Sequence, residues 1–447
     1  MSNQTAFAPV YAPWQRYLIR VGVLFIILLS LPLQADFYRT LFGLRWSYLV
    51  TDLFNLLVYL PHFFGEISQI YDWLVALFLA LIGAGIWFKI ERKAPARDAL
   101  YFYLLRIFVR FRLAAMLFVA GFTKLFAIFA PELSLSHLNT GYGYFEDLKH
   151  LYLSLSAAPA YLVFLGVVEL LAAVLLLFRR TSFLAVIIII PFYGNVFLAD
   201  LAYAGDYYLA SAYIVLLTLP VFLYDVERLS KLIVDLQLTL PERWKFDWKL
   251  TAWGRWKWAL KFLFFISFGL LVGFRTLDIS RSSSLYYPEQ KGLEGIAGKY
   301  AVDNFIWNGD TLAFSPTDSL RWKDVVFEEW NTLSVRVNHA VKTTSSPGFL
   351  KRQDTERDYE YAHVGDRLYY RYTTTGDEKQ ISLQNPNPNY VNDRYSFAVE
   401  RPDSLHVRLI GSNLQGDSLI VSLSKLDKKY LLHEVKKEGR RKLGFKL

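Results

Sequence analysis

The sequence predicts a membrane-embedded all-α helical bundle followed by an all-β antiparallel barrel or sandwich domain. Two observations carry this prediction. Apolar runs long enough to cross a bilayer as helices recur up to about residue 274 and are absent beyond Arg275. Short runs that alternate apolar and polar residues then follow, separated by glycine-containing turns. We therefore expect a transmembrane domain over residues 1–280 and a β-domain over residues 281–447.

The composition agrees with a membrane protein and excludes several chemistries. Of the 447 residues, 54% are hydrophobic, which is too many for an ordinary soluble protein. The chain contains no cysteine, so disulfides, thiol nucleophiles and iron–sulfur ligation within it are excluded. None of its seven histidines falls inside a predicted span, and no histidine–carboxylate group has metal-ligand spacing. We expect neither a haem nor another metal site.

Seven segments are predicted to span the membrane as helices. A further apolar segment, Trp46 to Phe64, is interrupted by Asp52, Asn55 and Pro61, which favours a helix at the membrane surface over an eighth span. The predicted spans are 17–34, 73–88, 113–130, 159–178, 181–199, 207–224 and 259–274.

The chain has a net charge of +9, and many of its basic residues lie in the loops between spans. Basic clusters occur at 89–112, 179–180 and 228–261, and all three fall on one side if seven spans alternate. This positive-inside pattern predicts a cytoplasmic N-terminus and an extracytoplasmic β-domain. The partner that these cations indicate is the lipid bilayer, and we expect no nucleic-acid partner.

Two predicted spans each carry one ionisable residue, Lys124 and Glu169. A charge at that depth costs roughly 2.5–3.5 kcal/mol on insertion scales, so it usually faces the bundle interior and has a partner. Both lie in the half of the bilayer nearer the same surface, and Asn195 lies at a similar level. We predict a polar intramembrane cluster of these three residues. Lys124 and Glu169 could form a structural ion pair that joins two helices, or they could take part in quinone binding or proton transfer.

The loop 131–158 joins these two spans. It contains His137, Asn139, Tyr142 and Tyr144. One interpretation is a solvated loop that caps the bundle; the other is a lid over the Lys124–Glu169 region.

Beyond residue 280, alternation predicts half-buried strands. Leu405, Val407 and Leu409, followed by a second alternating run at 419–423, describe an antiparallel hairpin. Eight or nine such strands are predicted, with turns at Asn308-Gly309, Gly365-Asp366, Gly376-Asp377 and Gly416-Asp417.

An ordered set of motifs resembles the DoxX family, in particular its large multi-span members with a C-terminal β-domain from Gram-negative bacteria. The set comprises Gly121 to Lys124, Tyr142-Gly143, Gly166 to Glu169 and Arg179-Arg180-Thr181, within a core of about residues 100–230. The resemblance implies a bacterial inner-membrane protein with a periplasmic β-domain. For some members it also implies a link to thiosulfate:quinone oxidoreduction.

Two functional hypotheses follow, and the residues leave open whether the chain is an enzyme. The first is a membrane redox component that binds a quinone in the bundle and serves another membrane or periplasmic protein. The alternative is a non-catalytic anchor or assembly protein whose β-domain binds a ligand or partner.

Overall fold

The computed structural model describes residues 11–65, 68–91, 96–203, 208–237, 253–282, 285–345, 351–375 and 379–438. The chain forms two compact units. The first comprises Met1–Ala127 and Val163–Arg281, and the second comprises Ile128–Leu162 and Ser282–Leu447. The division at Arg281 lies beside the expected boundary at residue 280. The second unit, however, also includes the segment that joins two helices of the first.

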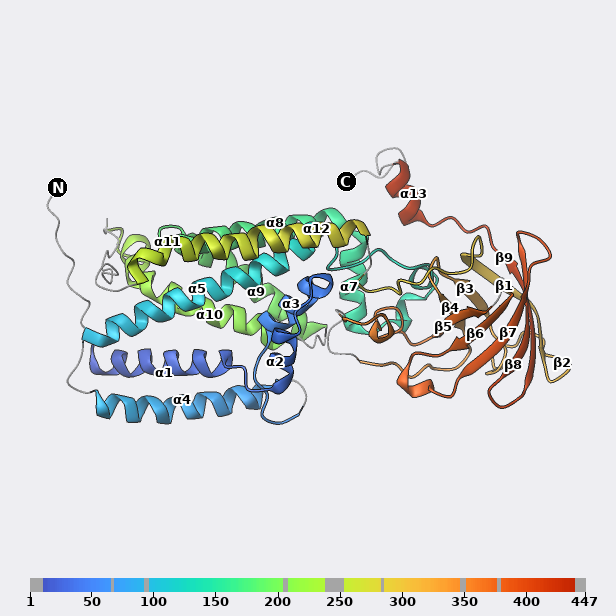
Figure 1. Ribbon diagram of the computed structural model, residues 1–447, viewed down its shortest axis with the longest axis horizontal. Coiled ribbons are helices and arrows are strands. Elements are labelled where there is room, and N and C mark those ends of the chain that lie inside the picture. Colours follow the sequence, from blue (N-terminus) through green and yellow to red (C-terminus); the bar gives the residue numbers. More distant parts are fainter. Residues whose placement is uncertain are drawn as a thin grey trace. The chain divides into compact units, whose positions relative to one another are not determined.

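The first unit is a bundle of long helices (Figure 1). Three short helical segments lie between the first two long helices: α2 (Ala35–Phe42), η1 (Trp46–Tyr48) and α3 (Leu49–Val58). The last long helix is continuous through α11 (Trp253–Phe264), the π-helical η4 (Phe265–Leu271) and α12 (Val272–Ser282). The other long helices are α1 (Pro13–Ser30), α4 (Ile70–Ile90), α5 (Ala96–Leu125), α8 (Pro159–Leu177), α9 (Ser182–Ala202) and α10 (Tyr208–Ile233).

Six helices among the described residues are long and apolar enough to cross a membrane. The chain is therefore a membrane protein. They correspond to all the predicted spans except 113–130, which falls on α5. This helix of 30 residues has a length of about 45 Å, but its cations reduce its apolar character. It ends at Leu125, and Ala127 adopts a positive φ of 55°, so the helix stops short of the predicted residue 130.

The segment at 46–64 contains a helix over Trp46–Val58 that is too short to span. Thirteen helical residues extend about 20 Å, against a hydrocarbon core of about 30 Å. Its α3 portion packs on α5, where Arg112 donates a hydrogen bond to the carbonyl of Leu57. In the third basic cluster, residues 238–252 lie outside the described residues.

The core of the bundle is built from small and aliphatic side chains on α5, α8, α9 and α10. Ala114, Leu117, Ala185 and Leu217 are fully buried there. Pro191 lies inside α9, which continues as one helix through that residue. The neighbouring Gly194 and Asn195 also lie within it.

The second unit contains a closed antiparallel barrel. Its strands are β1 (Gly298–Trp307), β2 (Asp310–Thr311), β3 (Asp324–Phe327), β4 (Thr332–Arg336), β5 (Arg367–Thr375), β6 (Gln380–Gln384), β7 (Arg394–Glu400), β8 (His406–Asn413) and β9 (Ser418–Lys425). Neighbours pair in the order β2-β1-β3-β4-β5-β6-β7-β8-β9, and β9 also pairs with β1, with Phe305 opposite Val421. Eight strands thus close the barrel and leave β2 as an appended ribbon. Closure leaves few exposed strand edges.

The predicted hairpin is present as β8 and β9. Val407 pairs with Leu423 and Leu409 with Val421, and these four side chains are buried. Asn308 and Gly309, with φ of 48° and 91°, form the predicted turn between β1 and β2. The predicted turn at 376–377 lies outside the described residues.

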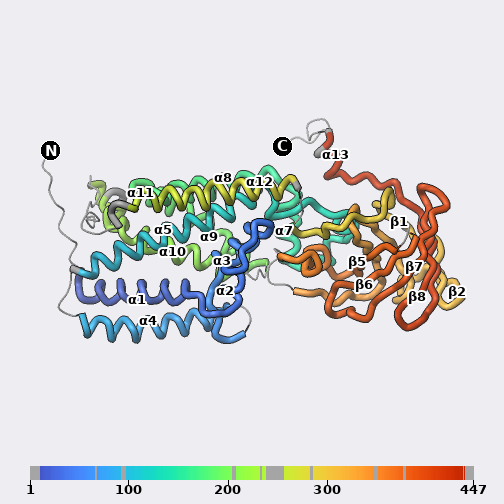
Figure 2. The backbone as a smooth tube through the Cα atoms, viewed as in Figure 1, coloured from blue at the N-terminus to red at the C-terminus, as the bar shows by residue number. Residues whose placement is uncertain are grey.

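Helical segments from 128–162 cover part of the barrel's outer face. They are α6 (Leu135–Leu138), η2 (Tyr142–Tyr144) and α7 (Asp147–Ala157), and Figure 2 labels α7 beside the strands of the second unit. Outward-facing residues of β3 and β4, such as Val326 and Ser334, are consequently buried. Short helices η5 (Asp354–Glu356), η6 (Pro388–Tyr390) and α13 (Leu431–Glu438) complete the unit.

Candidate functional site

Lys124 and Glu169 form an ion pair between α5 and α8. The Nζ atom of Lys124 donates to both carboxylate oxygens of Glu169, at 2.8 and 2.9 Å. The Glu169 side chain is 1% exposed and that of Lys124 12%. Asp200, near the end of α9, also interacts electrostatically with Lys124. The arrangement places a positive and a negative charge in direct contact inside the bundle.

Two glycines bring the pair together. A Cβ atom added to Gly166 would lie 2.5 Å from the backbone nitrogen of Leu125 and 2.7 Å from the carbonyl oxygen of Gly121. The backbones of α5 and α8 therefore touch at this crossing, as small residues allow between membrane helices. Lys124 follows Gly121 by three residues and Glu169 follows Gly166 by three residues, which is about one helical turn. Each side chain therefore lies on the face of its helix that contacts the other helix. This contact gives a physical reason for the Gly-x-x-Lys and Gly-x-x-Glu motifs.

The third member of the cluster is Tyr193 rather than Asn195. The hydroxyl of Tyr193 donates to Oε1 of Glu169 at 2.8 Å, and the residue is 5% exposed. Asn195 lies two residues further along α9, where its side chain is exposed. Two residues turn a helix by about 200°, so a face that presents Tyr193 inward presents Asn195 outward.

The four predicted lid residues all lie in the second unit. His137 is buried, and its Nε2 lies 3.1 Å from the carbonyl oxygen of Glu360. Asn139 is also buried, whereas Tyr142 and Tyr144 are 79% and 49% exposed. The segment is therefore no solvated loop, because it forms helices packed on the barrel. Its role as a lid over Lys124 and Glu169 stays a prediction.

Two buried carboxylates lie between this segment and the barrel. Glu328, which follows β3, accepts hydrogen bonds from the backbone nitrogen and the hydroxyl of Ser136, at 2.7 and 2.5 Å. Glu360 accepts hydrogen bonds from Trp330 Nε1 at 2.6 Å and from Thr332 Oγ1 at 2.9 Å. Burial raises the pKa of Glu328 above its ordinary value. Burial, and secondarily the charge of Glu328, raises the pKa of Glu360 to about 7.

A buried lysine interacts electrostatically with Glu360. Lys149 on α7 is fully buried, donates to the carbonyl of Tyr359 and sits 3.7 Å from the centroid of that ring. Burial lowers its pKa to about 7. Burial, followed by the charge of Lys149, also holds the pKa of His137 well below its ordinary value. The four ionisable side chains Glu328, Glu360, Lys149 and His137 are all buried, so their protonation is coupled to the stability of the unit.

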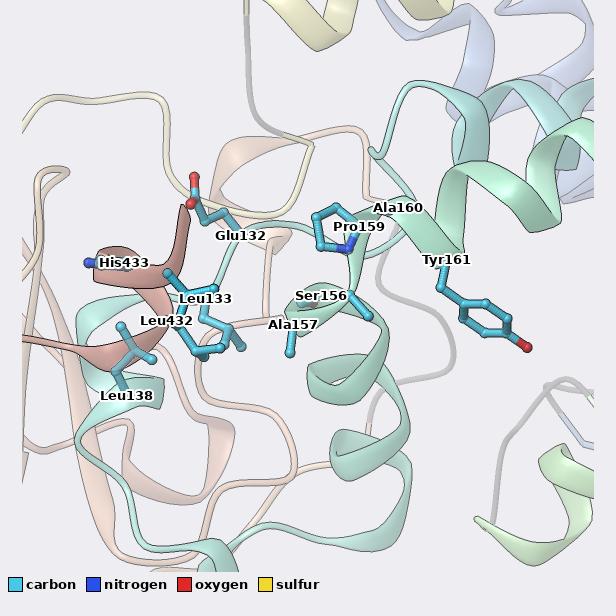
Figure 3. Close-up of a pocket in the computed structure, with 12 residues that line it drawn as sticks. Glu132, Leu133, Leu138, Ser156, Ala157, Pro159, Ala160, Tyr161, Leu432 and His433 are labelled. Atoms are coloured by element: carbon cyan, nitrogen blue, oxygen red, sulfur yellow. The ribbon is translucent and has the colours of Figure 1, made fainter. Parts of the chain in front are cut away.

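A pocket of about 400 Å³ opens elsewhere in the second unit (Figure 3). One wall comprises residues of the 132–161 segment, among them Leu133, Leu138 and Ala157. The other wall is α13, through Leu432, His433 and Val435. Pro159, Ala160 and Tyr161, the first residues of the candidate span α8, line the same pocket.

Asn139 fixes the chain that leads into α13. Its Nδ2 donates to the hydroxyl of Tyr430 at 2.6 Å, and its Oδ1 accepts from Lys428 Nζ at 2.9 Å. A residue predicted as part of a lid thus holds one wall of a pocket.

Sequence reasoning missed Tyr193, Lys149, the carboxylates Glu328 and Glu360, and the pocket wall on α13. Tyr193 had a detectable signal, because it is an aromatic residue with a hydroxyl group inside the predicted span 181–199. Glu328, Glu360 and Lys149 gave none, since each reads locally as a solvent-facing residue.

Comparison with known proteins gave no match to a family model, a curated protein or a solved structure.

Proposed function

We propose that the protein is a membrane-anchored binding protein whose β-domain holds the acyl chain of a lipid-like ligand. The helical bundle is the anchor in this proposal, and the Lys124–Glu169 pair fastens two of its helices. The observation that carries the proposal is the pocket between the 132–161 segment and α13.

The pocket suits an apolar chain. Leucine, valine, alanine and proline side chains make up most of its wall, and Glu132, Ser156 and His433 supply polar groups. Sites for apolar ligands combine such walls with a few polar groups that fix orientation. The first turn of the candidate membrane span α8 also lines the pocket, so in this proposal a membrane lipid could reach it.

Side chains fill the interior of the barrel, which favours the pocket beside α13 as the binding site. Large side chains, including Tyr300, Phe305, Phe327, Tyr370 and Phe397, are almost completely buried in the barrel core. An eight-stranded barrel is just wide enough for its side chains or for one small ligand. Here the side chains occupy it.

Photo-crosslinking tests the proposal. The full-length protein in lipid nanodiscs is irradiated with a photoactivatable long-chain fatty acid, and labelled peptides are identified by mass spectrometry. We expect labels on peptides that contain residues 132–161 and 428–438. Ala157→Trp fills the pocket and should abolish these labels, whereas Ala340→Trp, at an exposed position outside it, should not. Labelling confined to other peptides, or unaffected by Ala157→Trp, would contradict the proposal.

A redox role with a quinone is the second candidate function. It is favoured by the Tyr193 hydroxyl bound to Glu169, since a quinone site needs a proton donor or acceptor inside an apolar bundle. Extraction of the lipids that co-purify with the protein tests it. Quinone in stoichiometric amount would support the redox role, and its absence would leave the binding role.

We further propose the orientation that the basic clusters predict, in the inner membrane of a Gram-negative bacterium and with DoxX-like ancestry for residues 100–230. Protease added to spheroplasts should remove a tag placed after Leu447 and spare one placed before Met1. The reverse result would place the β-domain in the cytoplasm.

A further inference from the structure

Basic side chains converge where α8 ends. Arg110 on α5 donates from Nε and Nη2 to the carbonyl of Leu176, at 2.9 and 2.7 Å. Lys261 on α11 donates from Nζ to the carbonyl of Leu177 at 3.2 Å. These acceptors belong to consecutive residues, so the two cationic groups, from different helices, lie close together. Their electrostatic interaction agrees with this.

Two more cations, Arg106 and Arg179, contact Tyr224 on α10 near the same helix end. The guanidinium carbon of Arg106 lies 3.3 Å from the centroid of the Tyr224 ring. Arg179, two residues beyond the end of α8, donates from Nη2 to the Tyr224 hydroxyl at 3.3 Å. Arg106 precedes Arg110 by one turn of α5, and both interact electrostatically with Arg179. Four cations thus form one cluster, comprising Arg106, Arg110, Arg179 and Lys261.

Helix capping explains only part of this cluster. Cations at a helix C-terminus satisfy its last carbonyls and its negative partial charge, which accounts for Arg110 and Lys261. Arg106 and Arg179 add two further charges. Asp225 is a carboxylate that interacts with both of them, and it also interacts with Arg228, so cations outnumber acids among the described residues that interact here. Arg106 is only 6% exposed, and its buried Nε has no hydrogen-bond partner among the described residues. A buried cationic donor of this kind favours a further anionic acceptor.

We propose that this cluster binds the phosphate of an anionic membrane phospholipid. Guanidinium groups match phosphate oxygens with paired, charge-assisted hydrogen bonds. The end of a span lies at headgroup level whichever way the chain is oriented, and basic pockets between membrane helices are known lipid-headgroup sites.

The neighbouring surface indicates a lipid rather than a soluble anion. Trp258 lies near Lys261, with the Nζ atom 5.4 Å from its ring centroid, and Trp258 is 66% exposed. On the same helix Phe262 and Leu263 are also exposed, at 67% and 59%. Tryptophan is typical of the membrane interface, and the exposed apolar residues provide a surface for the acyl chains.

Lipid retention measured by native mass spectrometry tests the proposal. The full-length protein is purified in detergent and titrated with phosphatidylglycerol or with phosphatidylcholine, and the retained lipid is counted. We expect retention of phosphatidylglycerol over phosphatidylcholine, and its loss by roughly tenfold or more in Arg106→Gln/Arg179→Gln, which removes two charge-assisted contacts. The control Arg97→Gln/Lys231→Gln removes two cations elsewhere on the bundle and should retain the lipid as the wild type does.

Three results would overturn the proposal: equal retention of both lipids, wild-type retention by the Arg106/Arg179 variant, or displacement of the lipid by inorganic phosphate alone, which would indicate a soluble anion. If the double variant fails to fold by circular dichroism, Lys261→Gln serves in its place. That residue is partly exposed, and its loss should also weaken phosphatidylglycerol retention.

Discussion

Glu169 in the bundle is buried in a different way from Glu328 and Glu360 in the second unit. In the bundle, Glu169 is neutralised by direct contact with Lys124, and Tyr193 supplies a further hydrogen bond. In the second unit, Glu328 and Glu360 receive their hydrogen bonds from neutral donors, and their pKa values rise. Glu169 thus has a cationic partner, whereas protonation is favoured at Glu328 and Glu360.

The difference follows from what each environment provides. Lipid offers no water to solvate a stray charge, so a carboxylate within a span needs a cation from a neighbouring helix. In the second unit a serine, a threonine and a tryptophan satisfy the carboxylate oxygens, but they do not offset the loss of hydration that burial causes. The comparison predicts that replacing either member of the Lys124–Glu169 pair destabilises the bundle. It also predicts that the stability of the second unit changes with pH, because the pKa values of Glu328 and Glu360 are raised.

The largest effect should come from breaking the pair in the bundle. Lys124→Met or Glu169→Leu leaves an uncompensated buried charge and should lower the free energy of unfolding by about 3–5 kcal/mol, while the double variant should recover much of it. Denaturant unfolding in detergent measures this. Lys231→Met, which breaks the exposed pair with Glu227, is the control and should change little. Single variants as stable as the wild type would show that contact between Lys124 and Glu169 does not stabilise the bundle.

The pH dependence of the second unit should be the next largest effect. The folded pKa of Glu360, about 7, exceeds its ordinary value of 4.5, so the native state binds a proton that the unfolded state releases. This stabilisation is complete below pH 4.5 and is lost as the pH rises to about 7, an effect on the order of 1–3 kcal/mol. Glu360→Gln should flatten the profile between these values. Parallel profiles for variant and wild type would contradict the assignment.

Lys149 should act in the adjoining pH window. Its folded pKa of about 7 lies below its ordinary value of 10.5, so the unfolded state binds the additional proton and stability rises as the pH rises from 7 to 10.5. Lys149→Met should remove this rise and leave the Glu360 window in place. A rise that survives the substitution would have to come from another group.

A moderate effect should follow from separating α5 and α8. Gly166→Ala places a methyl group against the backbone of Leu125 and should destabilise the bundle by about 1–3 kcal/mol. Gly194→Ala is a matched control on α9, where an added Cβ meets nothing within 4 Å, and should be neutral or slightly stabilising. Thermal unfolding of the two variants side by side gives the answer, and equal midpoints would mean that the helices can move apart freely.

The smallest effect should come from one neutral donor in the second unit. Ser136→Ala removes the hydroxyl that donates to Glu328 and should cost about 1 kcal/mol. Because a protonated Glu328 needs this hydrogen-bond donor less than a charged one does, the loss should be smaller at acidic pH. Denaturant midpoints at two pH values test this, and a loss that grew on acidification would argue against the protonation of Glu328.

The sequence by itself determined the kinds of element and their approximate limits. An apolar run of about twenty residues is stable in a bilayer as a helix. Apolar residues at every second position, such as Val407 and Leu409, fit a strand with one face toward the barrel core. The pairing of Lys124 with Glu169 was also predictable, since two opposite charges at similar depth in consecutive spans have few other partners.

Only the tertiary structure decided how distant parts of the chain combine. It joined 128–162 to the β-domain through contacts such as that of Ser136 with Glu328, 192 positions apart, and it closed a pocket with α13. It also turned Tyr193, rather than Asn195, toward Glu169. Local pattern shows that a residue is polar or apolar, but the rotation of a helix and the surface that covers a strand depend on packing with partners far away in the sequence.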